Sequence, residues 1–196
     1  MSQEHVESVE LVSAESVAYL TASVLIASLT AVLAQLSIPF AGGVPFSFQP
    51  FGVFFAGILL GPFWGGFSML VYFVVGIAGV PVFSNFNVGL GYVFGPTGGF
   101  LIGFIVGAFV LGLLVHRSVE PRPIHHLSTI SMAAGLTAAI VVIYAFGVPW
   151  LWLLGGDELS LVAAAASMAP LFVMDFIKAG IVFGLVASGN ELLDRF

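Results

Sequence analysis

The sequence is organised as long, uninterrupted apolar runs, separated by short stretches rich in glycine, proline and polar residues. The runs lack the alternation of apolar and polar positions that β-strands would show over about ten residues, and they are long enough for helices. Proline suits the first position of a helix, so the last helix is expected to begin at Pro170, with a possible short helix before it at 159–168. The punctuation predicts six helical spans: 17–38, 50–60, 63–79, 97–116, 127–148 and 170–193.

The distribution of charge indicates that these helices lie in a membrane. No Asp, Glu, Lys, Arg or His occurs from Val17 through Val115, a stretch of 99 residues, and only 7% of the 196 residues are charged. A membrane-spanning helix needs about 20 apolar residues, and a soluble domain carries about 25% charged residues. These numbers exclude a soluble enzyme, and four Lys and Arg residues with a net charge of −6 exclude a nucleic-acid-binding protein. We therefore predict an all-α integral membrane protein.

The few charges outside the spans predict the domain organisation and the orientation. Residues 1–16 carry four Glu and no Lys or Arg, which is unlike a secretory signal, so the first helix is expected to be retained. The three arginines, Arg117, Arg122 and Arg195, follow the fourth and sixth spans, and the positive-inside bias makes that side cytoplasmic. The prediction is an acidic cytoplasmic tail at 1–16, one transmembrane domain at 17–193, and a cytoplasmic C-terminus at 194–196.

Two charges interrupt the sixth span and are the leading candidates for a ligand site. Asp175 and Lys178 are expected on one face of the helix, since their i,i+3 spacing lets them neutralise each other. Ionisable residues inside a membrane span are costly and usually functional. From Pro170, Lys178 would lie about 12 Å into the helix, in the outer half of the membrane. The alternative is a purely structural ion pair.

The loops that this orientation places outside supply neutral polar candidates. Asn85, Asn87 and Tyr92 stand among apolar residues in the loop after the third span, and Gln49 stands in a similar setting near the second. These side chains could bind a ligand, although loop chemistry and interhelical hydrogen bonds explain them equally well. Glycines in the same loop would let backbone approach a ligand closely: Gly89, Gly91, Gly95, Gly98 and Gly99.

Other residue types argue against catalysis and metal binding. The chain has no Cys and no nucleophile–base constellation, and no phosphate-binding G-x-x-x-x-G-K-[ST] motif. Its four His residues make no recognised ligand spacing with a carboxylate, so we expect them to be solvated or interfacial: His5, His116, His125 and His126. We therefore expect neither an enzyme nor a metal site, and no cofactor.

Three segments together resemble the BioY family, the biotin-specific S-components of energy-coupling factor transporters. They are VPFSFQPFGVFFAGILLGPFWG (44–65), GIAGVPVF (76–83) and GLGYVFGPTGGFLIGF (89–104), and the sixth span adds PLFVMDFIKA. The dense part of the resemblance covers about residues 41–112. Two positions depart from the family pattern: Phe63 replaces a frequent basic residue after Gly-Pro, and Phe100 replaces a frequent Tyr after GPTGG.

The resemblance implies the S-component fold, with six helices, both termini in the cytoplasm, and a biotin pocket closed over by outer loops. Asp175 and Lys178 match the charged pair of the family, and Asn85 or Asn87 with Tyr92 match its polar loop positions. It also gives a meaning to the small residues of the first helix, a face on which S-components dock to a transmembrane coupling protein that carries two ATPase subunits. In this sequence that face would comprise Ala18, Ala22, Ala27 and Ala31.

Biotin suits these residues chemically. Its ureido ring has two N–H donors and one carbonyl acceptor, its fused rings are apolar, and its valerate carboxylate could point to the outer loops or to Lys178. The predicted function is biotin uptake across the cytoplasmic membrane, with ATP hydrolysis supplied by a separate module. The alternatives are an S-component for another vitamin, a structural membrane protein without a ligand, and, a distant third, an integral-membrane hydrolase.

Overall fold

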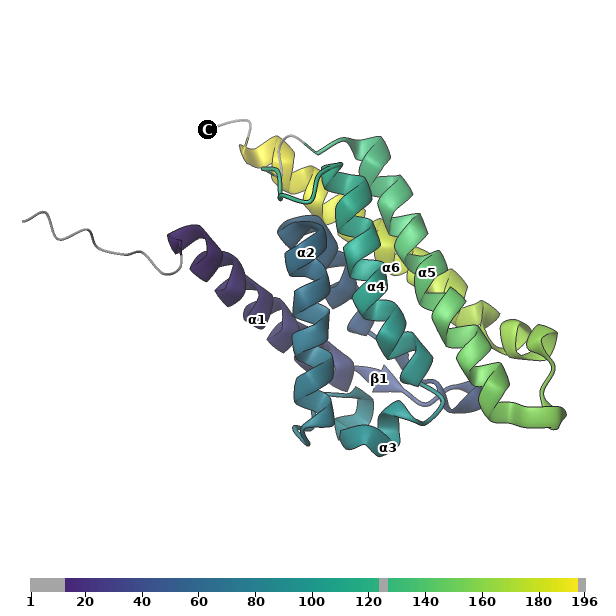
Figure 1. Cartoon of the computed structure of the whole chain (residues 1–196). Helices are drawn as coiled ribbons and strands as arrows, with labels where there is room; N and C mark the ends of the chain where they lie inside the picture. The colour runs from purple at the N-terminus through teal and green to yellow at the C-terminus, as the bar shows by residue number, and fades with distance from the viewer. Residues whose placement is uncertain (1–12, 124–126, 194–196) are drawn as a thin grey trace, which may run out of the picture.

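The structure, a computed structural model, describes residues 13–123 and 127–193. Within these residues it is a bundle of helices (Figure 1), five of which are long and apolar enough to cross a membrane. The five are α1 (Ala14–Gln35), α2 (Gln49–Ile77), α4 (Gly98–His116), α5 (Thr129–Gly155) and α6 (Leu161–Leu193). The prediction of an all-helical membrane protein is confirmed.

The long helix α2 consists of two antiparallel segments that turn back on each other at Gly61. Gly61 has φ 75° and ψ −173°, values that no helix contains, and Pro62 lacks the N–H that would continue the hydrogen-bond ladder. A Cβ built on Gly65 would lie 2.8 Å from the carbonyl oxygen of Ala56, so residues on either side of the turn are in backbone contact. The sequence-predicted break between the second and third spans is therefore present, and the described residues contain the six predicted helical segments in the predicted order.

Two helix boundaries differ from the prediction because both involve a proline that lies inside a helix. α5 continues through Pro149 to Gly155, and α6 begins at Leu161, nine residues before Pro170. Ser160 provides the start of α6, since its hydroxyl accepts a hydrogen bond from the N–H of Ala163 at 3.1 Å. Transmembrane helices tolerate proline where neighbouring groups satisfy the freed carbonyl. Lys178 consequently lies about 25 Å along α6 from its first residue, not 12 Å.

The connections at one end of the bundle contain short elements that the sequence did not predict. α1 ends at Gln35, and the next residues form β1 (Ser37–Ile38), which pairs antiparallel with β2 (Phe46–Ser47) around the 3-10 turn η1 (Ala41–Gly43). The loop after α2 contains the 3-10 turn η2 (Ser84–Phe86) and the five-residue helix α3 (Gly89–Val93). Both connections reach back towards the interior of the bundle, where the site lies.

α4 is the central helix and α1 the most peripheral. In their most apolar stretches, 61% of α4 is buried within the protein but only 22% of α1, which packs mainly on α2. Glycines let α4 approach its neighbours: a Cβ on Gly103 would lie 2.9 Å from the Ile143 backbone of α5, and one on Gly112 would overlap the Gly61 backbone of α2. Small residues at helix crossings are the usual means of close packing in membranes.

The beginning of α1 and the end of α6 lie towards the same end of the bundle, as Figure 1 shows. This placement agrees with an even number of spans. The side of the membrane that this end faces stays a prediction, as do the domain boundaries at residues 16 and 193; residues 1–12 and 194–196 lie outside the described part of the chain.

Candidate functional site

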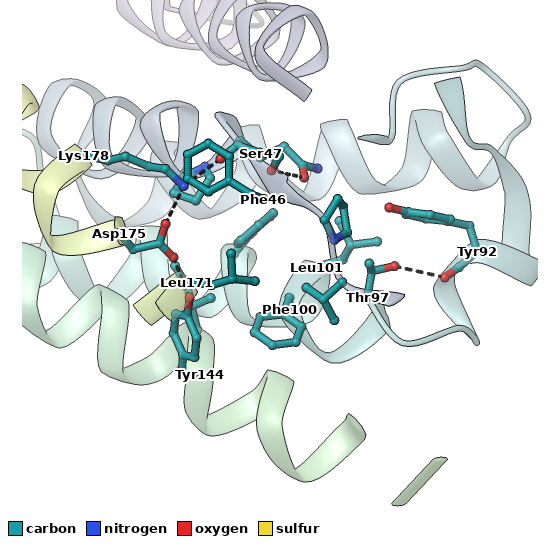
Figure 2. Close-up of a pocket in the computed structure, with 16 residues that line it drawn as sticks. Phe46, Ser47, Tyr92, Thr97, Phe100, Leu101, Tyr144, Leu171, Asp175 and Lys178 are labelled. Carbon is teal, nitrogen blue, oxygen red and sulfur yellow. Dashed lines mark hydrogen bonds and ion pairs between the residues drawn. The ribbon is translucent and has the colours of Figure 1, made fainter. Parts of the chain in front are cut away.

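A cavity lies between α6, α5, the start of α4 and the connection that contains β2. Asp175 and Lys178 mark one end and Tyr92 and Thr97 the other, with Phe46, Phe100 and Leu101 between them (Figure 2). Its volume is about 40 Å³, whereas an engineered cavity that binds benzene has a volume of about 150 Å³. A ligand with two polar ends and an apolar middle matches this layout, and its binding requires the lining side chains to move apart.

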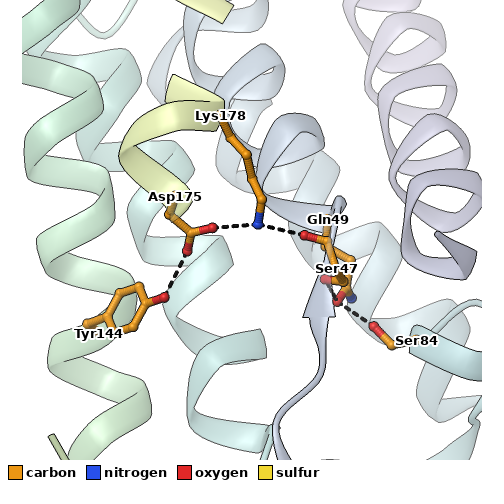
Figure 3. A network of polar contacts seen from close by, with 6 residues as sticks. All are labelled: Ser47, Gln49, Ser84, Tyr144, Asp175 and Lys178. Carbon is orange, nitrogen blue, oxygen red and sulfur yellow. Dashed lines mark hydrogen bonds and ion pairs between the residues drawn. The ribbon is translucent and has the colours of Figure 1, made fainter. Parts of the chain in front are cut away.

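The predicted charged pair is present and buried at one end of this cavity. The Lys178 ammonium lies 2.6 Å from Oδ1 of Asp175, and the two residues are 5% and 6% exposed. The hydroxyl of Tyr144, from α5, donates a hydrogen bond of 3.0 Å to Oδ2 of the same carboxylate (Figure 3). Tyr144 was missed by the sequence analysis, although a phenol within an apolar span is itself a signal of a buried polar contact.

The Lys178 ammonium makes two hydrogen bonds within the protein and also faces an aromatic ring. One N–H donates to Asp175, one donates to the carbonyl oxygen of Ser47 at 2.7 Å, and the ammonium lies 4.4 Å from the centre of the Phe46 ring. An ammonium has three donors and no acceptor, and these two hydrogen bonds use two of the donors. Its role in this arrangement is to neutralise Asp175 and to hold β2 against α6.

Asp175, by contrast, retains unused acceptor capacity on the cavity wall. Each carboxylate oxygen can accept two hydrogen bonds, and each oxygen has one partner here, Lys178 or Tyr144. The carboxylate is therefore held in place by two side chains and can accept two further N–H groups. This geometry favours a ligand with neutral N–H donors at this end over one with a carboxylate.

Gln49 lines the cavity but its amide is engaged by the protein. Its Oε1 accepts hydrogen bonds from the hydroxyls of Ser47 and Ser84, at 2.8 and 2.7 Å, and its Nε2 donates to the Tyr72 hydroxyl at 2.6 Å. The Tyr72 hydroxyl donates in turn to the carbonyl of Val82. Figure 3 shows how Ser84, Gln49 and Ser47 continue the chain of contacts from Lys178. Gln49 is thus placed to hold the loop after α2 against the pocket.

The opposite end of the cavity carries only neutral groups. Tyr92 stacks on Phe83 with ring centres 5.2 Å apart, and the Thr97 hydroxyl donates to the Tyr92 carbonyl at 3.3 Å. Burial raises the pKa of the Tyr92 phenol, so this hydroxyl stays neutral at physiological pH.

The two loop asparagines lie outside this cavity. Asn85 accepts a hydrogen bond from the Ser37 hydroxyl at 3.0 Å, and Asn87 donates to the Ser84 carbonyl at 2.7 Å. Both line a second cavity of about 110 Å³. This cavity shares Tyr92 and Pro45 with the first. A role for Asn85 and Asn87 in ligand binding stays a prediction, and the structure separates both from the cavity that contains Asp175.

The predicted glycines do not line the cavity, and two of them have a packing role instead. Gly98 and Gly99 begin α4, where a Cβ would overlap the Val93 carbonyl and the Trp150 side chain respectively. Gly89 and Gly91 have no atom within 4 Å of a Cβ position, so packing does not constrain them.

The four alanines of the predicted small-residue face of α1 differ in their exposure. Ala18 is exposed and Ala22 and Ala31 are half-buried, but Ala27 is only 5% exposed and belongs to the core. Ala27 is therefore not part of an open docking face, because the helix turn that carries it packs with Ser23 and Thr30 in the interior.

The expectation of a solvated His116 is wrong. His116 is fully buried at the end of α4; its Nε2 lies 2.9 Å from the Ile58 carbonyl, and its Nδ1 accepts the Arg122 N–H at 2.8 Å. In a continuous helix the Ile58 carbonyl would bond the N–H that Pro62 lacks, so His116 replaces a missing backbone donor. His5, His125 and His126 lie outside the described residues. Within the described residues, no group of three potential metal ligands occurs.

The fold and the site define a polytopic helical membrane protein with a ligand pocket enclosed by its helices and the loops at one end. The sequence matches the BioY family over residues 4–195, and the chain belongs to this family. The predicted resemblance is confirmed.

Individual relatives agree with this assignment. The chain is 38% identical over 161 residues to a biotin transporter BioY of Rhodobacter capsulatus, covering 77% of this chain and 80% of the relative. It is 34% identical over 158 residues to a probable biotin transporter BioY of Pyrococcus horikoshii, covering 79% and 85%. Its fold is similar to the crystal structure of the S-component for biotin from an ECF-type ABC transporter, with a TM-score of 0.67, 22% identity, and coverage of 94% and 95%.

Proposed function

We propose that the protein is the substrate-binding component for biotin uptake across the cytoplasmic membrane, and not an enzyme. The relatives from Rhodobacter capsulatus and Pyrococcus horikoshii are named biotin transporters, the latter as probable. The observation that carries the proposal is the Asp175 carboxylate, buried, neutralised by Lys178, and open to two more N–H donors.

The proposed pose places the ureido ring of biotin at Asp175. The two ureido N–H groups would use the free acceptor positions of the carboxylate, and the fused rings would lie among Phe46, Phe100 and Leu101. Ligand pockets of this kind are mostly apolar, with few polar groups that fix orientation. The valerate chain would then extend towards Tyr92 and the loops.

Titration calorimetry on the purified protein tests this function. Biotin is expected to bind with a sub-micromolar Kd, and riboflavin and thiamine are expected not to bind. Asp175→Asn should weaken biotin binding strongly because it removes an acceptor and leaves a buried ammonium unpaired. Asp157→Asn is the matched control, since Asp157 is exposed in η4 (Gly156–Glu158), away from the pocket. Tight binding of riboflavin or thiamine instead of biotin would assign another vitamin, and no binding at all would refute a transport role.

We propose further that uptake depends on a coupling protein with two ATPase subunits that docks on α1. The support is the open face of α1 with its small residues, Ala18, Ala22 and Ala31. Ala22→Trp should abolish uptake by proteoliposomes containing the whole complex while biotin binding persists. Ala27→Trp should damage the fold, because this side chain is buried. Equal uptake with and without the ATPase module would contradict the proposed partner.

A further inference from the structure

The second cavity, behind Tyr92 and Pro45, has no function in the proposed binding of the ureido ring. It has a volume of about 110 Å³ and is formed by the α1–α2 connection at 39–45 and by Asn85 and Asn87. Figure 2 shows Tyr92 at the end of the ligand pocket opposite to Asp175. A ligand whose ureido ring is at Asp175 would therefore direct its valerate end at this cavity.

Among the residues that the structure describes, no positive charge lies at this end to receive a carboxylate. The walls of the second cavity belong to the stretch from Val17 through Val115, which contains no Lys, Arg or His. The one cation of the ligand pocket, Lys178, is at the opposite end, where it pairs with Asp175 and donates to the Ser47 carbonyl. Tyr92 stays neutral because burial raises its pKa. A carboxylate here would accept hydrogen bonds from neutral donors but would have no cation to pair with, so replacing it by an amide forfeits no ion pair.

The two asparagines offer both a donor and an acceptor. Asn85 uses its Oδ1 with Ser37, and so presents its Nδ2 donors, whereas Asn87 uses Nδ2 with Ser84, and so presents its Oδ1 acceptor. A carboxylate has no N–H for the Asn87 oxygen, but an amide has both an acceptor and a donor. Both side chains are exposed, so a longer substituent can continue from here into solvent.

We infer that the second cavity accepts the carboxyl end of the ligand in neutral, amide-linked form, so that the protein binds biotinyl amides as well as free biotin. This inference rests on the proposed function and on the pose with the ureido ring at Asp175. The substrate class is biotin whose carboxyl group is condensed with an amine, including the amide with the side chain of lysine.

Calorimetry with three ligands tests the inference: biotin, biotinamide and Nε-biotinyl-lysine. If a cation recognised the carboxylate, biotinamide would bind far more weakly than biotin. The neutral site predicts Kd values for both amides within tenfold of that for biotin. In Asn87→Trp the ring should fill the second cavity and weaken Nε-biotinyl-lysine at least tenfold more than it weakens biotin, because the lysine amide needs more of this space. Val88→Trp, next in sequence but outside the cavity, is the matched control.

The outcomes separate this inference from the proposed function. If biotin itself does not bind, the proposed function fails. If biotin binds but either amide binds more than tenfold more weakly, the proposed function stands and the inference is overturned. The inference is also overturned if Asn87→Trp weakens biotin as much as its lysine amide. Should Asn87→Trp fail to fold, the Kd ratios of the unaltered protein still decide the question.

Discussion

Replacing Lys178 by Met removes the positive member of the buried pair while keeping a long, unbranched side chain. Asp175 would keep its contact with Tyr144 but lose the charge 2.6 Å from Oδ1. The Ser47 carbonyl would lose its donor as well. In the interior of the bundle, the variant thus leaves the Asp175 carboxylate without a positive charge beside it and the Ser47 carbonyl without a hydrogen-bond donor.

The expected loss of stability follows from this burial. Removing one partner of a buried ion pair costs about 3–5 kcal/mol in unfolding free energy, because the remaining charge is uncompensated. For a protein of this size that corresponds to a fall in Tm of about 6–20 °C. In the double variant Asp175→Asn/Lys178→Met no charge remains, Asn can still accept from Tyr144, and the groups that lose or lack a partner are neutral: the Ser47 carbonyl and the new amide N–H groups. Its cost should be about 1–3 kcal/mol.

Thermal unfolding of the purified proteins in detergent, monitored by tryptophan fluorescence, measures the relative stabilities of the wild type and the two variants. The double variant should be more stable than Lys178→Met alone, although it carries one more substitution. If the two have the same Tm, Asp175 is not left uncompensated and the reasoning is wrong. The folded double variant should also fail to bind biotin; binding as tight as in the wild type would make the pair purely structural.

Four further substitutions, the last of them a control, probe three contacts with different roles. Tyr144→Phe removes a hydrogen bond to the Asp175 carboxylate and keeps the ring, so the Kd for biotin should rise about ten- to a hundredfold in calorimetry. His116→Ala leaves the buried Ile58 carbonyl and the partly buried Arg122 N–H without their partner, and should lower the unfolding free energy by about 1–3 kcal/mol, measured as a fall in Tm. Gly112→Ala places a methyl group against the backbone of α2 and should destabilise, whereas Gly184→Ala meets no atom within 4 Å and should stabilise slightly.

Each of these expectations has an opposing result. Unchanged affinity in Tyr144→Phe would mean that the phenol does not position Asp175 for the ligand. An unchanged Tm in His116→Ala would mean that water satisfies the Ile58 carbonyl equally well. Equal effects of alanine at Gly112 and Gly184 would mean that the close approach of α4 to α2 is not required.

Much of the fold was predictable because lipid restricts the alternatives so strongly. Continuous apolar runs in a membrane must be helices, and the Gly61-Pro62 pair combines a residue that tolerates positive φ with one that has no N–H. The same rule failed at Pro149 and Pro170, where helix–helix packing keeps the backbone helical across the proline. Local sequence gives no information on whether a neighbouring helix will support such a position.

The site was predictable only where a residue was chemically out of place. Asp175 and Lys178 stood out because charge is costly in a span. Tyr144 did not, because its role depends on the proximity of α5 to α6. Whether Gln49 contacts a ligand or the protein is decided by Ser47, Ser84 and Tyr72, which come from three separate parts of the chain.

The contact between His116 and Ile58 also bears on the order in which the protein assembles. The first segment of α2, from Gln49 to the turn at Gly61, is about 18 Å long and too short to cross the bilayer core independently. Its Ile58 carbonyl finds a donor only in a residue 58 positions later. During synthesis, the α2 hairpin therefore cannot reach its final form until α4 has been made and inserted beside it. The native turn at Gly61 depends on a helix that is synthesised later.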